Sequence, residues 1–485
     1  MPDHRNKLQA LFEPAHRYAN FGAVLTRMHV QGFRCHESTL IEVESPITAF
    51  CGLNGTGKST LLQLAACSYR CPPNHGTRYY IRDFIVAGTL DPDPFSKTAV
   101  AEYGYWEQDR TIRNLKVTRS ASESRWRGYK AQPERPCYFA GMGLYLPRIE
   151  VRDFVVRNAA SVTVEQATPL DLAARTKATR ILSCTYDAMV DNTVRHGRRQ
   201  GHVVTVERGG KQYSEANMGC GEGRVQHLIR RLSTLPERSL VLLEEPETSL
   251  HPSAQHEFGR YLIDVCIDRK LQVLLTTHSE YLLRSLPSAS RVYVDRGPAG
   301  LIRVIKGVTT AQAMSMMTGG KDKALHVLVE DHVAVSTLTE IVRRGDPGFL
   351  HAIAVHPAGD SRAIQSAMSA LRETGLPVVA VRDGDMPSQP RENIFKLPGA
   401  LPPERELLQS GAVQEYLQSN YGIDMGEFVA AIAELDHHEW FDRLAKRVVA
   451  SEPALVQEAA RVYAQSLPES EVDLITKQLQ ESIRK

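Results

Sequence analysis

The feature that most constrains this 485-residue chain is a glycine-rich loop at residues 52–59, which reads Gly-Leu-Asn-Gly-Thr-Gly-Lys-Ser. The loop follows an apolar run at residues 47–51 and precedes a helix-like stretch at residues 60–64, so the local order is strand, loop and helix. In this context the pattern G-x-x-x-x-G-K-[ST] binds phosphate, because its glycines let backbone N–H groups and a helix N-terminus converge on the anion. The sequence therefore predicts a nucleotide-binding α/β unit.

The residues of the loop have predicted roles at the nucleotide. Lys58 is expected to reach the β- and γ-phosphates, and Ser59 to place its hydroxyl on Mg²⁺. The predicted cofactors are ATP and Mg²⁺, and the other predicted cofactor-binding residues of this stretch are Asn54, Gly55, Gly57 and Thr60.

A second block, at residues 239–247, is an apolar run that ends in paired carboxylates. We assign Glu244 to the Mg²⁺ side and Glu245 to the catalytic base that polarises the attacking water. A further apolar strand, at residues 271–277, ends at His278, which can sense the γ-phosphate. Glu245, His278 and Lys58 are therefore the predicted catalytic residues.

A third block, at residues 217–224, reads Asn-Met-Gly-Cys-Gly-Glu-Gly-Arg and opens a helix. Glycines at such a place predict a close backbone approach to an anion. We expect Gly219, Gly221 and Glu222 to contact the nucleotide of a second subunit. The chain is therefore predicted to form a homodimer or a higher oligomer.

The composition predicts the compartment but not the ligand. The net charge of +2 is uninformative about nucleic acid, so a DNA site must be argued from local sequence. Basic and aromatic residues interleave over residues 113–130; they could stack bases and hold phosphates, although a solvated edge hairpin is the commoner origin of such a pattern. Eight cysteines without a C-x-x-C pair, and apolar runs too short for a signal peptide or a membrane span, predict a cytoplasmic protein with no membrane partner.

The remaining pattern of the first half predicts a mixed sheet. Residues 24–30 and 41–43 alternate as two antiparallel strands would, and the segments 79–86 and 100–117 continue this alternation. Helical periodicity runs over residues 169–190.

The second half begins with a predicted linker and continues with a compact β-α-β-α-β pattern. The strands are expected at residues 325–330, 351–355 and 377–385, the helices at 331–344 and 361–374, and the chain is expected to leave the sheet at residue 393 for a helical tail. Glu330, Asp383 and Asp385 fall at strand ends, where a parallel sheet places its ligands, and their oxygens suit Mg²⁺ or Mn²⁺. Residues 436–439 also offer metal-type ligands, but neighbours on a helix face different sides, so a surface helix is predicted there.

The order of these blocks resembles the ABC-type ATPase heads. More closely, residues 244–252, which read Glu-Glu-Pro-Glu-Thr-Ser-Leu-His-Pro, resemble the OLD-like (overcoming lysogenization defect) and RecF-like ATPases. The strands that end at Glu330 and at Asp383-Gly-Asp385 resemble the Toprim domain that follows the ATPase in OLD-family nucleases, including the Gabija defence nuclease. There a glutamate and a D-x-D pair hold the metals that activate water against phosphodiesters.

Three positions depart from the pattern of these families. Glu244 stands where an aspartate is usual, Gly219 where a serine touches the partner's γ-phosphate, and Ala334 where the Toprim pattern has another acid. The first two departures imply slow ATP hydrolysis. The third leaves open whether the second half cuts DNA itself or is a scaffold, as in Septu-type ATPases, that controls a separate nuclease or toxin subunit.

The resemblance thus implies a bacterial antiphage ATPase whose nucleotide state gates DNA cleavage, with the regulatory scaffold as the alternative. A DNA-repair ATPase of the RecF kind and a transporter ATPase rank behind both. The expected architecture is an ABC-type head over residues 1–305, a linker over 306–323, a Toprim-like parallel α/β domain over 324–400 and a helical region over 401–485.

Overall fold

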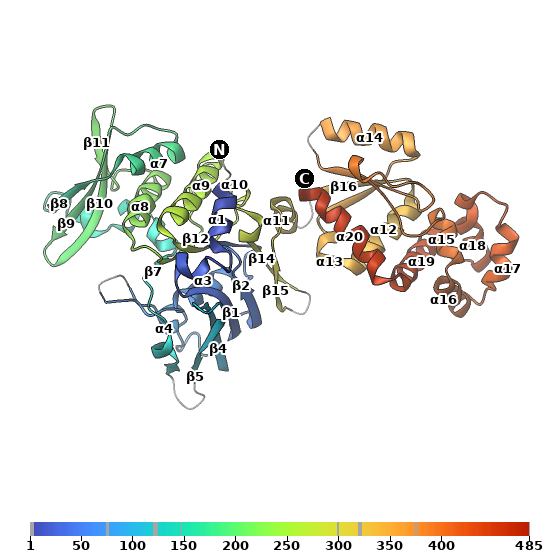
Figure 1. Ribbon diagram of the computed structural model, residues 1–485, viewed down its shortest axis with the longest axis horizontal. Helices are drawn as coiled ribbons and strands as arrows, with labels where there is room; N and C mark the ends of the chain where they lie inside the picture. The colour runs from blue at the N-terminus through green and yellow to red at the C-terminus, as the bar shows by residue number, and fades with distance from the viewer. Residues whose placement is uncertain are drawn as a thin grey trace. The chain divides into compact units, whose positions relative to one another are not determined.

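The computed structural model describes residues 4–73, 77–119, 125–146, 148–297, 300–318, 323–373 and 376–484. The chain divides into two compact units, Met1–Thr310 and Ala311–Lys485. Figure 1 draws the first unit in blue to yellow and the second in orange to red. Among the described residues, no helix combines the length and the apolar character that crossing a bilayer requires.

The first unit is built around a six-stranded sheet in the order β15-β14-β3-β13-β12-β7. All neighbouring strands in it are parallel except β14 and β15. Every residue of β3 and β13 is buried, as expected for parallel strands covered on both faces. The helices α3 and α9 pack on this sheet. The bounds are β3 Ile47–Cys51, β7 Cys137–Ala140, β12 Leu240–Glu244, β13 Gln272–Thr276, β14 Arg291–Arg296, β15 Ile302–Lys306, α3 Lys58–Ala66 and α9 Pro252–Arg269.

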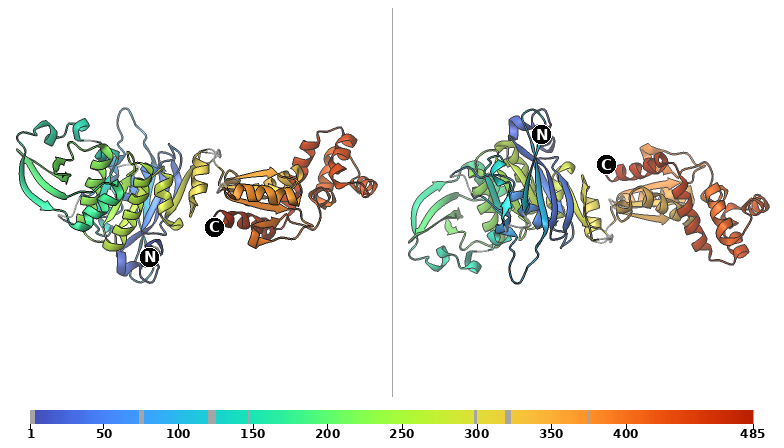
Figure 2. Two further views of the ribbon diagram at one scale, coloured as in Figure 1. Left: turned by 90° about the horizontal axis from the view of Figure 1, so that it is seen from above. Right: turned by 90° about the horizontal axis from the view of Figure 1, so that it is seen from below.

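Two antiparallel sheets complete the first unit. One has the order β2-β1-β4-β5-β6, and its β1–β2 pair is the antiparallel pair that the sequence alternation predicts. The other has the order β11-β10-β9-β8, and Figure 2 shows it in green, set apart from the central sheet. The bounds are β1 Val24–Phe33, β2 His36–Glu42, β4 Phe95–Trp106, β5 Ile112–Arg119, β6 Trp126–Arg127, β8 Thr163–Pro169, β9 Ala188–His196, β10 Arg199–Arg208 and β11 Lys211–Ser214.

The other helices of this unit lie between or beside the sheets. They are α1 His4–Phe12, α2 Arg17–Phe21, α4 Ile81–Phe84, α5 Arg148–Val151, α6 Phe154–Arg157, α7 Leu172–Leu182, α8 Cys220–Thr234 and α10 Glu280–Ser285.

Two local predictions for this unit are wrong. The alternating segment 79–86 contains the short helix α4 rather than a strand, because the Asp83 carboxylate accepts a hydrogen bond from Tyr80 N at 2.8 Å and caps the turn. The helix predicted over 169–190 is α7, which ends where Ser183 takes the left-handed conformation with φ of 52°. Residues 188–196 then form β9.

The second unit has a four-stranded, fully parallel sheet in the order β17-β16-β18-β19. Successive residues of β16 and β18 face opposite sides, and both sides are apolar: Leu328 and Ala380 pack with helix α14, whereas Val327 and Val381 face the larger core that includes α12. Figure 1 shows α14 and α12 on the two sides of the sheet. The bounds are β16 Leu325–Val329, β17 Ile353–Pro357, β18 Val378–Arg382, β19 Ile394–Lys396, α12 His332–Gly345, α13 Pro347–Leu350 and α14 Ser361–Glu373.

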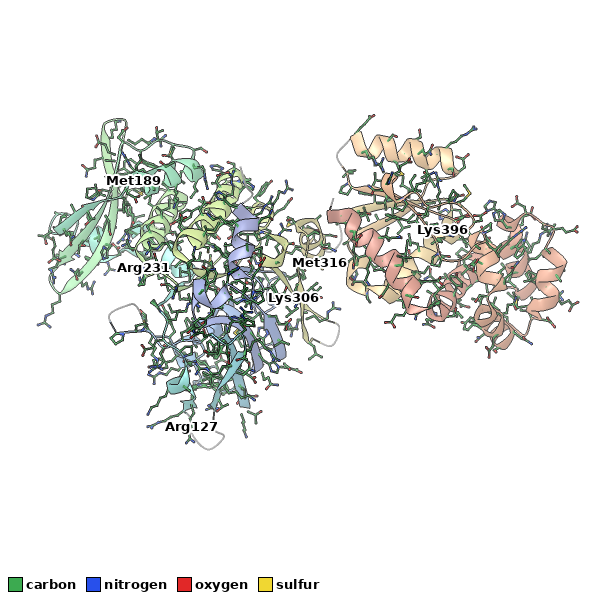
Figure 3. All side chains as sticks on the ribbon, in the orientation of Figure 1. Arg127, Met189, Arg231, Lys306, Met316 and Lys396 are labelled. Atoms are coloured by element: carbon green, nitrogen blue, oxygen red, sulfur yellow. The ribbon has the colours of Figure 1, made fainter. Side chains whose placement is uncertain are left out.

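The prediction that the chain leaves the sheet at residue 393 is wrong. Ile394–Lys396 is the strand β19, and it pairs parallel with β18. Ile394 and Phe395 are buried on opposite faces, so this short segment supplies core to both sides. Lys396, labelled in Figure 3, donates from Nζ to Gly384 O at 2.9 Å and thereby holds the loop after β18.

The C-terminal helices belong to the same core as the sheet. Trp440, Leu444 and Tyr463 pack in one buried cluster with Leu338 of α12 and Val379 of β18. Helix α11 occupies part of the predicted linker; residues 319–322 of that linker lie outside the described residues. The helices are α11 Thr310–Met317, α15 Pro403–Gln409, α16 Gly411–Tyr421, α17 Met425–Ile432, α18 Trp440–Val448, α19 Glu452–Ser466 and α20 Glu469–Arg484.

Candidate functional site

The glycine loop joins β3 to α3 in the conformation that anion binding requires. Gly55 and Gly57 have φ of 79° and 83°, which side chains other than glycine rarely adopt. A Cβ on Gly57 would lie 2.2 Å from His36 Nε2, so the position needs glycine for space as well. Beside the loop, Arg34 donates to Thr60 Oγ1 at 3.1 Å. The backbone N–H groups of this turn and the start of α3 form a concave site suited to phosphate.

Lys58 is the cation of this loop. Its side chain is buried, and its Nζ donates to Gly52 O at 2.9 Å and to Leu53 O at 2.8 Å. Burial lowers the pKa of Lys58, and the charge of Glu245 partly opposes that shift. The ammonium group therefore lies at the loop and is electrostatically coupled to the predicted catalytic base.

Parallel pairing brings the other predicted catalytic residues to the same edge of the sheet. Thr276 of β13 is paired with Phe50 of β3 on one side and with Glu244 of β12 on the other. Glu245 N donates to Thr276 O at 3.1 Å, and the His278 Nε2 atom lies 3.5 Å from Glu245 Oε1. Burial, reinforced by Lys58, lowers the pKa of His278. Glu245 and His278 thus face each other across adjacent strand ends, and Glu244 and Ser59 are half-buried at this edge.

Glu247 is a residue of this site that the sequence reading did not single out. It is 4% exposed, its Oε1 accepts from Thr277 Oγ1 and, at 3.3 Å, from His278 N, and among the described residues its Oε2 has no hydrogen-bond partner. Burial raises the pKa of Glu247 to about 7. Its carboxyl group holds the loop after β13 against the loop after β12. The signal that could have found it is a third acid two residues beyond a paired-carboxylate strand end.

The glycine-rich start of α8 lies beside a cavity of about 220 Å³ lined by Gly219, Gly223, Arg148 and Arg224 among others. Position 221 requires glycine for packing, because a Cβ there would lie 2.5 Å from Ser249 O. Arg148 and Arg224 line the cavity, but so do Asp153 and Glu215, which both pair with Arg148 and balance its charge. The cavity offers a helix N-terminus, a feature that favours an anion.

Glu222 is placed differently from the glycines of this segment. Its Oε1 accepts from Tyr186 OH at 2.8 Å and from Tyr213 OH at 2.7 Å, so its carboxylate is held by β11 and by the segment that precedes β9.

In the second unit, the predicted carboxylates gather at the ends of two parallel neighbours. Glu330 follows β16, and Asp383 and Asp385 follow β18. Asp383 is 6% exposed, and within the described chain its Oδ1 has no hydrogen-bond partner. Burial, followed by the charges of Glu330, Asp331, Glu404 and Asp385, raises the pKa of Asp383 to about 8. Buried oxygen donors with this much negative charge suit a divalent cation, and Mg²⁺ or Mn²⁺ matches the donor set.

Glu404 lies near this group, and the sequence pattern did not predict it. It lies in the first turn of α15 and is 1% exposed, and burial raises its pKa to about 7. The position at which the resemblance implied an acid, Ala334, is fully buried in the core and donates its N–H to Asp331 Oδ1 at 2.8 Å. Packing therefore accounts for alanine at position 334.

Asp436, His438 and Glu439 are exposed, as predicted for this segment, but the prediction that neighbouring side chains face different sides of a helix is wrong. His437–Glu439 is a single 3-10 turn, η5, that precedes α18, and the two imidazoles do not face different sides. Their ring centroids are 4.0 Å apart, and His438 Nδ1 lies 3.2 Å from Glu404 Oε1.

Comparison with known proteins identifies the class of the first unit. Residues 27–131 match a family model described as "AAA domain", and residues 125–284 match one described as "AAA domain, putative AbiEii toxin, Type IV TA system". The first unit therefore carries AAA-type P-loop ATPase domains, which implies that it binds nucleotide.

Individual relatives match over limited stretches or at low similarity. The chain is 35% identical over 89 residues to Protein ea59 of Escherichia phage lambda, a match that covers 18% of this chain and 17% of that protein. It is similar to an SMC head domain from Thermotoga maritima (15% identity, TM-score 0.35, covering 58% of this chain and 98% of the other). It is also similar to the Smc head domain from Pyrococcus furiosus in complex with the C-terminal domain of ScpA (14% identity, TM-score 0.37, covering 61% and 98%).

The buried Glu247 predicts a pH-dependent stability of the first unit. Because the folded pKa of about 7 is above the ordinary value of 4.5, stability is fully present below about pH 4.5 and is lost as the pH rises through 7. Glu247→Gln keeps the acceptor for Thr277 and removes the charge. We expect the free energy of unfolding of the variant, minus that of the native chain, to increase by up to about 3 kcal/mol as the pH rises from 5 to 8. The difference between their unfolding midpoints should increase in the same direction.

Thermal unfolding of the full chain at several pH values measures this. Glu237→Gln, at an exposed position of the same unit, is the control and should track the native chain. If the midpoint difference between Glu247→Gln and the native chain does not change with pH, the raised pKa assigned to Glu247 is contradicted.

Proposed function

We propose that this chain is an ABC-type ATPase of the OLD-like antiphage group, in which nucleotide binding by the first unit controls DNA cleavage at a Toprim-like metal site in the second. The observation that carries the proposal is the position of Asp383: nearly fully buried at the end of β18, with Glu330, Asp331, Asp385 and Glu404 around it. So many carboxylates close together are costly without a cation. Such a cluster at the end of parallel strands is what hydrolysis of a phosphodiester with bound metals needs.

The ATP-dependent step uses the edge where β3, β13 and β12 end. The loop glycines and Lys58 would hold the phosphates, and Ser59 and Glu244 would hold Mg²⁺. Glu245 is the general base, since its carboxylate can accept a proton from the attacking water, and His278 lies 3.5 Å away to contact the γ-phosphate.

The start of α8, with Gly219 at its N-cap, supports a nucleotide-dependent dimer. The cavity beside it is lined by Gly219 and Gly223, where the helix N-terminus could accept the γ-phosphate held by a second copy. ATP would then join two heads, and its hydrolysis would separate them, so the nucleotide acts as a switch.

The cleavage step uses Glu330, Asp383 and Asp385 as ligands of Mg²⁺ or Mn²⁺. When bound, the metal supplies a nucleophilic water and polarises the phosphodiester. The chain's own contribution is to hold these carboxylates: Lys396 donates to the carbonyl of Gly384, between Asp383 and Asp385, and keeps both aspartates at the strand end.

A basic and aromatic pocket supports contact with DNA. A pocket of about 620 Å³ is lined by Arg82, Arg119, Arg125, Trp126 and Tyr129, together with Tyr80, Ile85, Val86, Ala87 and Phe95. Trp126 stacks on Phe33 with ring centroids 5.4 Å apart, which leaves the pocket with a rigid aromatic wall. Aromatic faces beside arginines hold single-stranded nucleic acid through stacking and phosphate contacts.

The alternative is a regulatory ATPase whose second unit is a scaffold for a separate nuclease or toxin. The buried Ala334, in place of the acid expected there, favours this version. Purification of the chain together with the products of its neighbouring genes distinguishes the two, because only the alternative requires a nuclease subunit to co-purify.

We expect Glu245→Gln to slow ATP hydrolysis by about 10²–10⁴-fold while ATP binding is retained, because only the proton acceptor is lost. Phosphate release and nucleotide binding measure the two effects, and light scattering should show that ATP stabilises the dimer of this variant. Glu237→Gln is the matched control. Hydrolysis by Glu245→Gln at the native rate would show that Glu245 is not the base.

We expect the purified chain to nick plasmid DNA with Mg²⁺ or Mn²⁺, and Asp383→Ala to lose this activity. Asp442→Asn, at a partly exposed position paired with Lys446 at 2.6 Å, is the charge-matched control and should nick normally. Equal nicking by the native chain and Asp383→Ala, or none by either, removes the intrinsic-nuclease version.

We expect the double variant Arg82→Ala and Arg125→Ala to bind single-stranded DNA more weakly. The slope of log K against log salt should fall by about 1 for each lost phosphate contact. Arg284→Ala, which removes an exposed arginine of the same unit that pairs with Glu280, is the control. Unchanged affinity and salt slope in the double variant would place the DNA elsewhere.

A further inference from the structure

A histidine and carboxylate cluster lies between α15 and the turn η5, apart from the ligands assigned above. Glu404, His437 and His438 each offer one ligand atom, and these atoms all lie within 4.8 Å of one another. Asp331 is adjacent, with its Oδ2 at 3.6 Å from His438 Nδ1, while its Oδ1 caps α12. Three segments far apart in the chain therefore converge on this point.

The requirements of the fold do not account for Glu404. Its side chain is 1% exposed, and its Oε2 has no hydrogen-bond donor in the part of the chain that the structure describes, because the nearby Asp331 is also an acceptor when ionised. Leaving such an oxygen unsatisfied is costly. The neighbouring Glu439, by contrast, forms an ion pair with Arg443 at 2.9 Å. Within the described residues, the only basic side chain at ion-pair distance from Glu404 is His438.

The chemistry of the three groups selects the class of ion. Two imidazoles with one carboxylate suit Zn²⁺ and related transition-metal ions, whereas Mg²⁺ and Ca²⁺ prefer oxygen donors alone. Tetrahedral bonds of about 2.0–2.2 Å place ligand atoms about 3.3–3.6 Å apart. The three ligand atoms lie within 4.8 Å of one another, so modest side-chain rotations bring them to the distances that a bound ion requires.

We propose that Glu404, His437 and His438 bind a divalent transition-metal ion of the Zn²⁺ class, with Asp331 beside it as an available fourth ligand. The site is distinct in donor type from the all-oxygen group of Glu330, Asp383 and Asp385. The ion neutralises the buried Glu404 and ties η5 and α15 to the start of α12. It needs no nuclease activity, so the inference stands or falls independently of the proposed function.

The test uses the full chain, freed of metal by chelation and then placed in saturating Mg²⁺ to fill oxygen-only sites. Co²⁺ is the probe, because tetrahedral coordination gives it strong visible absorption, and Zn²⁺ should displace it. We expect one equivalent of Co²⁺ to bind, and His438→Gln and Glu404→Gln each to weaken binding by about tenfold or more. Glu439→Gln, in the same turn, is the control and should bind Co²⁺ as the native chain does.

A second measurement keeps the proposal testable if Glu404→Gln does not fold. The His438 side chain is 59% exposed, so His438→Gln leaves the core intact. Zn²⁺ should raise the unfolding midpoint of the native chain and of Glu439→Gln, but not that of His438→Gln. Equal Co²⁺ affinity in the native chain and His438→Gln, an equal Zn²⁺ effect on both, or no Co²⁺ binding in saturating Mg²⁺ would each overturn the assignment.

Discussion

The parallel pairing of neighbouring strands is the constraint on which both units depend. Parallel strands end at one edge of a sheet, so the residues that follow them meet whatever their separation in the chain. In the first unit, Thr276 lies between Phe50 and Glu244, and this register brings the glycine loop, Glu245 and His278 together. In the second unit, the pairing of β16 with β18 does the same for Glu330 and Asp383.

The two sheet edges differ in how their negative charge is balanced. At the first edge, Lys58 provides a cation within the loop itself. The buried Glu247 accepts a hydrogen bond from Thr277, and burial raises its pKa. At the second, Asp383 and Glu404 are buried with oxygens that have no partner among the described residues. Arg382 partly offsets the charge near Glu330, but within the described structure it forms no ion pair with Asp383 or Glu404. The first edge is therefore suited to an anionic ligand with its own Mg²⁺, and the second to metal ions.

Sequence reasoning succeeded where the chemistry follows directly from a strand. The glycine loop, the carboxylates at 244 and 245, and the strand ends at 330 and 383 all follow apolar runs, and each run is a buried parallel strand. It failed where a few local interactions decide the conformation. Asp83 caps a turn that alternation assigned to a strand, and Ile394–Lys396 is a three-residue strand too short for its period to be recognised.

The sequence alone determined the nucleotide-binding loop, the order of its partner strands and the existence of a second α/β unit, because these depend on periodicity and spacing within short segments. Only the tertiary structure decided which distant groups complete the sites. Glu404 carries no local pattern, since it lies in an ordinary helix start, and His437 and His438 offer metal-type ligands in the sequence without indicating a distant partner. Their proximity arises because α15 and η5 pack on the core shared with α12, and burial in that core is what makes the unpartnered Glu404 oxygen costly.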